Sequence, residues 1–109
     1  MAFDEVLAER IRAALTTVDA VTERKMFGGI AFMCSGNMAV GVIGSEAMVR
    51  VGPEAHDEAL ARPHARIMDF SSRPMRGFVY VEPDGVATDA DLAGWVAAGV
   101  SFAESLPPK

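Results

Sequence analysis

Residues Met26 to Ile43, which read MFGGIAFMCSGNMAVGVI, contain no charged side chain. A helix that crosses a membrane needs about 20 continuously apolar residues, whereas SGN and several glycines interrupt this run. Short apolar runs with β-branched residues, separated by turn residues, are typical of a β-hairpin. The stretch therefore predicts two adjacent strands, Ile30–Cys34 and Met38–Ile43, joined by a tight turn.

Two turns fit the SGN segment. A two-residue turn at Gly36-Asn37 would set Met33 opposite Val40, because glycine accepts the positive φ that such a turn requires. A three-residue turn with Asn37 in the left-handed conformation would instead set Phe32 opposite Val40. We favour the three-residue form because it places the large side chains on one face of the hairpin and the small residues on the other.

Hydrophobic periodicity and turn residues predict the remaining elements. They are an N-terminal helix capped by Asp4, a strand at 48–51, a helix ending before Pro63, strands at 66–70 and 77–82, and a helix starting at Thr88. The expected order is α-β-β-β-α-β-β-α. Hairpin-sized connections indicate an antiparallel five-stranded sheet, and three helices suffice to cover one face of it. A chain of 109 residues fits one such two-layer α+β domain, 1–109.

Net charge restricts the class of partner. The chain has 10 basic and 15 acidic residues, a formal charge of −5, which argues against strong direct binding of nucleic acid. The N-terminal segment has acids where a secretory signal peptide has a basic patch, so we expect a cytoplasmic protein without a membrane segment. Cys34 is the one cysteine, and a single thiol forms neither an internal disulfide nor a cysteine zinc cluster.

No catalytic constellation is visible. Nothing in the sequence brings a base near Cys34, so a small buried hydrophobic residue is the expected role of its side chain. His56 and His64 do not have the spacing of a known metal site. The FGG segment is followed by strand-like residues and not by a helix, which disfavours a phosphate-binding loop. We expect no enzyme activity, no metal and no cofactor.

A local surplus of arginine follows the second predicted helix. Arg62, Arg66, Arg73 and Arg76 lie close together in sequence with Asp69 as the only acid between them. Such a cluster is a candidate surface for an anion or an acidic partner. The alternative is a solvated rim whose arginines pair with acids elsewhere, such as Glu82 or Asp84.

The uncharged strands are a candidate interface. A half-solvated antiparallel strand alternates apolar with polar residues, and these two strands do not. If helices cover only one face, the other face exposes apolar surface of the kind that marks interfaces. The candidate residues are Ala31, Met33, Ala39 and Gly41, and the simplest occupant is a second copy in a homodimer. The alternative is that both faces are covered within one chain.

Five segments of the chain match a known family in order, from about Phe3 to Pro107. They read KMFGGIAFM, GNMAVGV, MVRVG, MDFSSRPMRGFVYV and LAGWVAAGVSFAESLP. The sequence resembles the N-terminal domain of the TfoX/Sxy family of competence regulators. The resemblance implies a two-layer α+β domain and a bacterial, cytoplasmic, non-enzymatic role. Family regulators that act in DNA uptake carry a second, C-terminal helical domain, which we do not find in this sequence.

Together these features predict a small protein-interaction module related to transcriptional regulators of competence. It is expected to act by docking a protein partner, such as a transcription regulator. The alternative function is a small-molecule or anion-binding protein, or an enzyme, that uses the region from Arg62 to Arg76.

Overall fold

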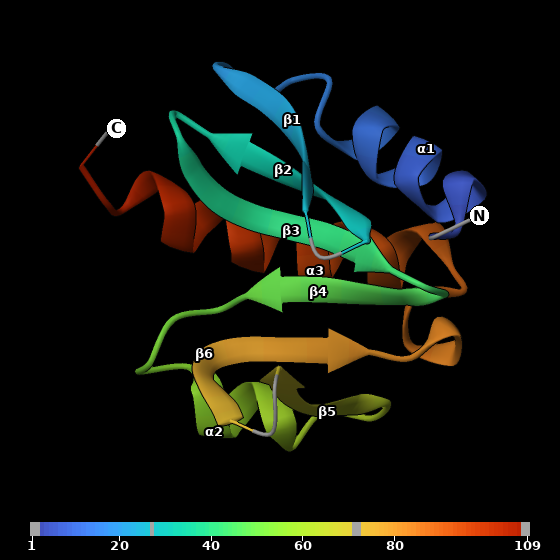
Figure 1. Cartoon of the computed structure of the whole chain (residues 1–109), viewed down its shortest axis with the longest axis vertical. Coiled ribbons are helices and arrows are strands. Elements are labelled where there is room, and N and C mark those ends of the chain that lie inside the picture. The colour runs from blue at the N-terminus through green and yellow to red at the C-terminus, as the bar shows by residue number, and fades with distance from the viewer. Residues whose placement is uncertain (1–2, 27, 71–72, 108–109) are drawn as a thin grey trace.

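Six antiparallel strands form one open sheet in the order β1-β2-β3-β4-β6-β5, with the helical layer against one face (Figure 1). The computed structural model describes residues 3–26, 28–70 and 73–107, without the side chains of 26, 67–70 and 73–76. The predicted α+β class is confirmed. The elements are α1 (Glu5–Ala14), β1 (Val21–Met26), β2 (Gly29–Cys34), β3 (Asn37–Ile43), β4 (Glu46–Arg50), α2 (His56–Leu60), β5 (Ala65–Phe70), β6 (Arg73–Val81), the 3₁₀-helix η1 (Pro83–Val86) and α3 (Asp89–Glu104).

The strand β1 corrects the predicted sheet of five strands to six. Its segment VTERKM contains three consecutive charged residues, a composition that does not indicate a strand by pattern. The reason lies in its position, because β1 is an edge strand that pairs only with β2. Exposed side chains at 22–25 can be polar there, and charge on an edge strand opposes pairing with other chains.

The β2–β3 hairpin combines features of both predicted registers. Phe32 pairs with Val40, as the three-residue form requires, but the register shifts by one residue between Phe32 and Met33. The turn itself has two residues, Ser35 and Gly36, with φ of 50° and 85°, which is the pattern of a type I′ turn. The predicted left-handed Asn37 is therefore wrong, because this residue begins β3 and the extra residue is accommodated as a bulge.

The main core lies between the sheet and the helices. Asp4 caps α1 by accepting hydrogen bonds from the backbone N–H groups of Val6 and Leu7, at 2.9 and 3.1 Å, which satisfies donors that a helix leaves open. Thr88 caps α3 in the same way. Figure 1 shows α3 running behind β3 and β4. A Cβ atom at Gly99 would collide with the Ala39 carbonyl oxygen, so glycine permits the close approach of α3 to β3.

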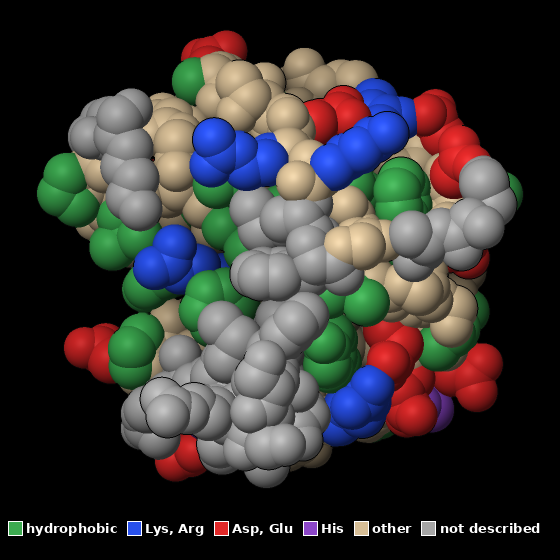
Figure 2. Space-filling model, viewed as in Figure 1, with side chains coloured by type: hydrophobic (Ala, Val, Ile, Leu, Met, Phe, Trp, Pro, Cys, Tyr) green, Lys and Arg blue, Asp and Glu red, His purple; other side chains and the backbone are tan. Residues whose placement is uncertain are grey.

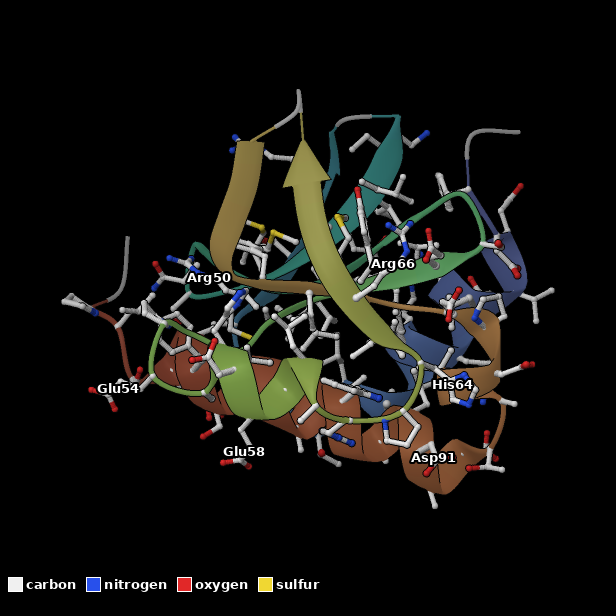
Figure 3. The ribbon with its side chains drawn as sticks, turned by 90° about the horizontal axis from the view of Figure 1, so that it is seen from below. Arg50, Glu54, Glu58, His64, Arg66 and Asp91 are labelled. Atoms are coloured by element: carbon white, nitrogen blue, oxygen red, sulfur yellow. The ribbon has the colours of Figure 1, made fainter. Side chains whose placement is uncertain are left out.

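The opposite sheet face has a smaller apolar cluster. Met48 and Tyr80 are buried there, with Met38, Ile43 and Phe78 partly buried against them. Figure 3 shows β5 and the adjoining part of β6 curving away from the helical layer, so the sheet is strongly bent. In Figure 2 this face shows basic side chains interspersed with hydrophobic ones. Within the described part of the chain, no helix has the length and apolarity that a membrane crossing requires.

Candidate functional site

The structure does not bring the described arginines of the predicted arginine surface together. Arg66 makes an ion pair with Glu46 of β4, with 2.8 Å between Arg66 Nε and Glu46 Oε2, and its guanidinium lies over the Tyr80 ring. Arg62 lies against Trp95 of α3, on the other side of the sheet. The side chains of Arg73 and Arg76 lie outside the described part. The expected pairing of this cluster with acids elsewhere is thus seen for Arg66, with Glu46 as the acid.

Arg62 borders a small cavity of about 230 Å³ at the beginning of α3. Its guanidinium carbon lies 3.6 Å from the centroid of the Trp95 ring, which is buried. His64 lines the same cavity in a left-handed conformation, with φ of 67°. Asp84 and Asp91 also line it. Two carboxylates beside one guanidinium disfavour an anionic ligand at this position.

The predicted apolar sheet interface is not one surface. The structure corrects the predicted position of Ala39 on the open sheet face. The hairpin bulge places this residue in the main core beneath α3, with no exposed area. Ala31 and Gly41 pair across β2 and β3 and are both buried. Met33 is half-buried and lines a shallow cavity near the end of the hairpin. Among the described side chains, Val6 of α1 is the one large hydrophobic residue that is exposed.

Cys34 is buried at the end of β2, with 2% of its surface exposed. Burial raises the pKa of its thiol, and the negative charge of Glu104 raises it further. Both effects reduce the fraction of reactive thiolate. His56 accepts a hydrogen bond from Gly77, and His64 lines the Arg62 cavity. Within the described residues, no cluster of His, Cys, Asp and Glu side chains could hold a metal ion.

The outer face of α3 is the surface that the sequence interpretation missed. Exposed positions along this helix carry small residues, namely Ala90, Ala93, Gly94, Ala97 and Ser101. Next to them, a groove of about 280 Å³ separates α3 from the end of α1 and the turn after it. Its lining is apolar apart from one hydroxyl and includes Ala14, Thr17, Val18, Ala93, Ala97 and Val100. We call this surface the α1–α3 groove.

Acidic side chains outnumber basic ones on the helices of the helical layer. The acids of the three helices are Glu5, Glu9, Asp57, Glu58, Asp89, Asp91 and Glu104, and their only basic residues are Arg10 and Arg12. Both arginines are ion-paired, Arg10 with Asp89 at 3.2 Å. Figure 3 shows Glu54, Glu58 and Asp91 on the side of the helical layer, whereas Arg66 points away from it. The helices that form the groove and its neighbours therefore carry an excess of negative charge.

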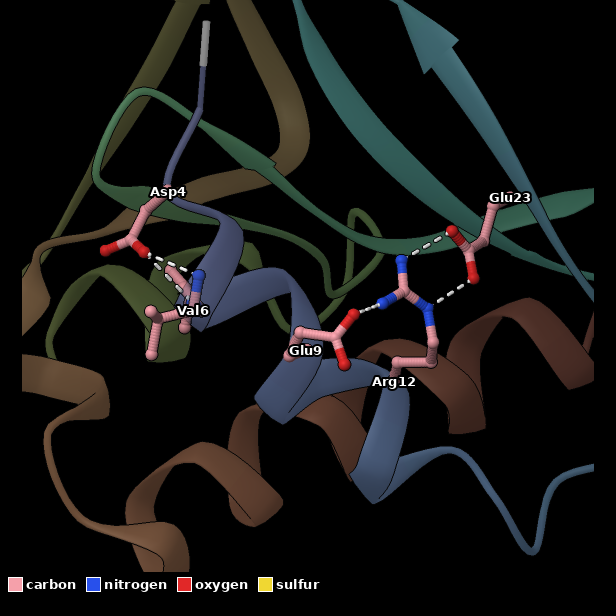
Figure 4. Close-up of polar contacts among 6 residues, drawn as sticks. Asp4, Val6, Glu9, Arg12 and Glu23 are labelled. Carbon is pink, nitrogen blue, oxygen red and sulfur yellow. Dashed lines mark hydrogen bonds and ion pairs between the residues drawn. The ribbon is translucent and has the colours of Figure 1, made fainter. Parts of the chain in front are cut away.

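An ion-pair cluster holds α1 against the sheet (Figure 4). Arg12 forms two parallel hydrogen bonds with the Glu23 carboxylate of β1, at 2.6 and 2.7 Å, and a third contact with Glu9. The hydrogen bond from Arg12 lowers the pKa of Glu23, and its charge acts in the same direction. The pKa of Arg12 is raised by the same bonds. This bidentate pair fixes the position of α1, which forms one wall of the groove.

The sequence of the last helix, α3, has a feature that indicates its exposed surface. No charged residue lies between Asp91 and Glu104, although a helix with one solvated face normally has charges on that face. The buried side of α3 accounts for Leu92, Trp95, Val96 and Val100. It does not account for the uncharged residues on the exposed side.

Comparison with known proteins identifies a family. A family model described as the TfoX N-terminal domain matches residues 13–103. No curated protein and no solved structure matches the chain significantly. The matched range covers the α1–α3 groove from its first lining residue, Ala14, to Val100.

Proposed function

This chain belongs to the TfoX N-terminal domain family, which is associated with competence regulation, and from that premise we propose that it is a protein-interaction domain. It acts by docking a partner at the α1–α3 groove, in the cytoplasm and without catalysis. One observation carries this proposal: the exposed face of α3 between Asp91 and Glu104 has small, uncharged residues beside an apolar groove. Small residues let a second helix approach closely, and the groove can receive its larger apolar side chains.

Charge complementarity determines the kind of partner. The excess of acidic over basic side chains on the three helices favours a partner helix with basic flanks, because opposite potentials steer association and fix orientation. The partner we propose is therefore an amphipathic helix with a narrow apolar stripe and lysine or arginine beside it. A transcription regulator that has such a helix is the class of protein consistent with the family.

A pair of matched variants tests the proposal. Ala97→Arg places a bulky cation in the groove, whereas Ala61→Arg makes the same change at an exposed position after α2. Proteins captured from the host by wild type and by Ala61→Arg, but not by Ala97→Arg, are the expected partners. Each is then purified and its affinity measured, and we expect Ala97→Arg to weaken binding by about a hundredfold. Equal affinity of both variants for every captured protein would refute docking at this groove.

Self-association through the sheet stays a prediction of the sequence. Its physical reason was an exposed apolar sheet face, and Ala31, Ala39 and Gly41 are buried within the chain. The alternative of an anion-binding protein using Arg62 also stays a prediction. The acids around Arg62 do not favour it.

A further inference from the structure

Arg50, at the end of β4, is half-buried and has no carboxylate partner among the described residues. Its guanidinium carbon lies 5.4 Å from the centroid of the Phe78 ring and 5.2 Å from that of Phe102. Both distances are within the range of a cation–π contact. The other half-buried arginines described are Arg10, which pairs with Asp89, and Arg12, which pairs with Glu23. Among the described residues, Arg50 is therefore a partly desolvated cation whose charge faces aromatic rings and no carboxylate.

A groove of about 500 Å³ has Val51, the residue after Arg50, in its lining. It is formed by the segment that follows Arg50 and by the last turns of α3, and includes Gly52, Pro53, Glu54, Ser101, Phe102 and Ser105. Phe102 belongs to both features, because its ring contacts Arg50 and lines the groove. Figure 3 shows Arg50 and Glu54 at the same end of the molecule.

The chain around this groove is held by unusual backbone geometry. Gly52 and Gly77 have φ of 89° and 91°, which glycine adopts without strain. The carbonyl of Gly77 accepts hydrogen bonds from the N–H groups of Val51 and Gly52, at 2.8 and 3.1 Å. A Cβ atom at Gly52 would collide with the Phe102 ring. The ring that contacts Arg50 therefore lies directly on a fixed backbone.

We propose that Arg50, with Phe78 and Phe102, binds a carboxylate that is joined to an apolar group seated in this groove. A guanidinium placed beside aromatic rings keeps its planar N–H edge for a bidentate bond to a carboxylate. The apolar part of the ligand would lie against Phe102 and Pro53. Glu54 lines the groove and repels negative charge, so a monoanionic carboxylate is favoured over a phosphate dianion. The carboxylate is that of a free organic acid or of a peptide C-terminus.

The test is a titration of the ¹⁵N-labelled full chain, followed by the amide signals of Gly52 and Phe102. The probes are phenylacetate, its neutral isostere phenylacetamide, and N-acetyl-Gly-Phe with a free or an amidated C-terminus. We expect the carboxylate forms to shift both signals with dissociation constants of about a millimolar, and the neutral forms to bind about tenfold more weakly. Tighter binding of phenylacetate indicates a free acid as the ligand, and tighter binding of the acetylated dipeptide indicates a peptide C-terminus.

Matched variants assign the effect to Arg50. Arg50→Met keeps the side-chain length and removes the charge, and we expect it to weaken carboxylate binding about tenfold. Arg24→Met changes an exposed arginine of β1 and is expected to leave binding unchanged. If Arg50→Met does not fold, the proposal is tested with Arg50→Lys. This variant keeps the positive charge but loses the planar guanidinium, and it should weaken carboxylate binding severalfold. The proposal would be overturned if the wild type showed no shifts, if the acid and the amide bound equally well, or if a folded Arg50 variant kept its affinity.

Discussion

The Nδ1 atom of His56 accepts a hydrogen bond of 2.9 Å from the backbone N–H of Gly77. The bond is buried and joins α2 to the point where β6 departs from extended geometry. It satisfies a buried backbone donor, so the imidazole has a structural role. The bent sheet therefore depends on a side chain from the helical layer.

Replacing this acceptor tests its role in stability. His56→Ala leaves the Gly77 N–H buried without a partner and should reduce the free energy of unfolding by about 2 kcal/mol. The control is His64→Asn, because asparagine tolerates the left-handed backbone of this exposed residue, and its effect should be within about 0.5 kcal/mol. Urea unfolding measures both. A His56→Ala variant as stable as His64→Asn would show that the contact contributes nothing.

Two glycines of α3 give opposite predictions for the same substitution. Gly99→Ala forces a methyl group against the Ala39 carbonyl oxygen and should destabilise by about 2 kcal/mol. Gly94→Ala adds a methyl group in open space on the exposed face and should stabilise by about 0.5–1 kcal/mol, the helix preference for alanine. Thermal unfolding of the two variants measures the difference. The same sign of change in both variants would contradict the described approach of α3 to β3.

The sequence indicates most of the fold because the buried elements have strong patterns. The caps at Asp4 and Thr88 and the pairing of Phe32 with Val40 follow from residue type and packing. The strand β1 could not be predicted in this way, because its own residues are charged and its extended conformation depends on pairing with β2. The position of Ala39 was missed for a similar reason, since a single bulged residue reverses which face the side chain occupies.

The candidate surfaces are less predictable than the fold. Arg62 and Arg66 are close in sequence, but the chain enters β5 between them, and Arg62 contacts Trp95 of α3 whereas Arg66 contacts Tyr80 of β6. Arg50 has no arginine near it in sequence, and its aromatic neighbours come from β6 and α3. Of these surfaces, only the exposed face of α3 can be recognised from one continuous stretch of sequence, namely its uncharged segment.

Acid pH should weaken the contact between α1 and β1. The pKa of Glu23 in the folded protein is below its ordinary value of 4.5, so its contribution to stability is present above that pH and is lost as the pH falls through the folded value. Both side chains are more than one-third exposed, and solvent screening limits the contribution to about 0.5 kcal/mol. Glu23→Gln should therefore lower the stability of the protein at pH 7, and by progressively less as the pH falls below 4.5. An effect that does not change as the pH is lowered through the acid range would contradict an electrostatic contribution.

Cys34 should be unreactive in the folded protein. Burial raises the pKa of the thiol and blocks access to it, so we expect Ellman's reagent at pH 8 to react at least about a hundredfold faster after unfolding in guanidinium. Cys34→Ala should cost about 1 kcal/mol of stability and leave partner binding intact. Fast labelling of the folded chain, or loss of binding in a folded Cys34→Ala variant, would contradict the structural role of this residue.

Hydrogen exchange of the full chain with and without its partner tests docking at the α1–α3 groove most directly. The partner used is a protein whose capture Ala97→Arg abolishes or, if there is none, the host protein that wild type binds most tightly. We predict that binding slows exchange in α3 between residues 90 and 101 and in the segment from Ala14 to Val18, which together form the groove. The amides of β5, at the opposite edge of the sheet from β1, should be unaffected. Protection confined to the sheet, with exchange in α3 unchanged, would contradict the account.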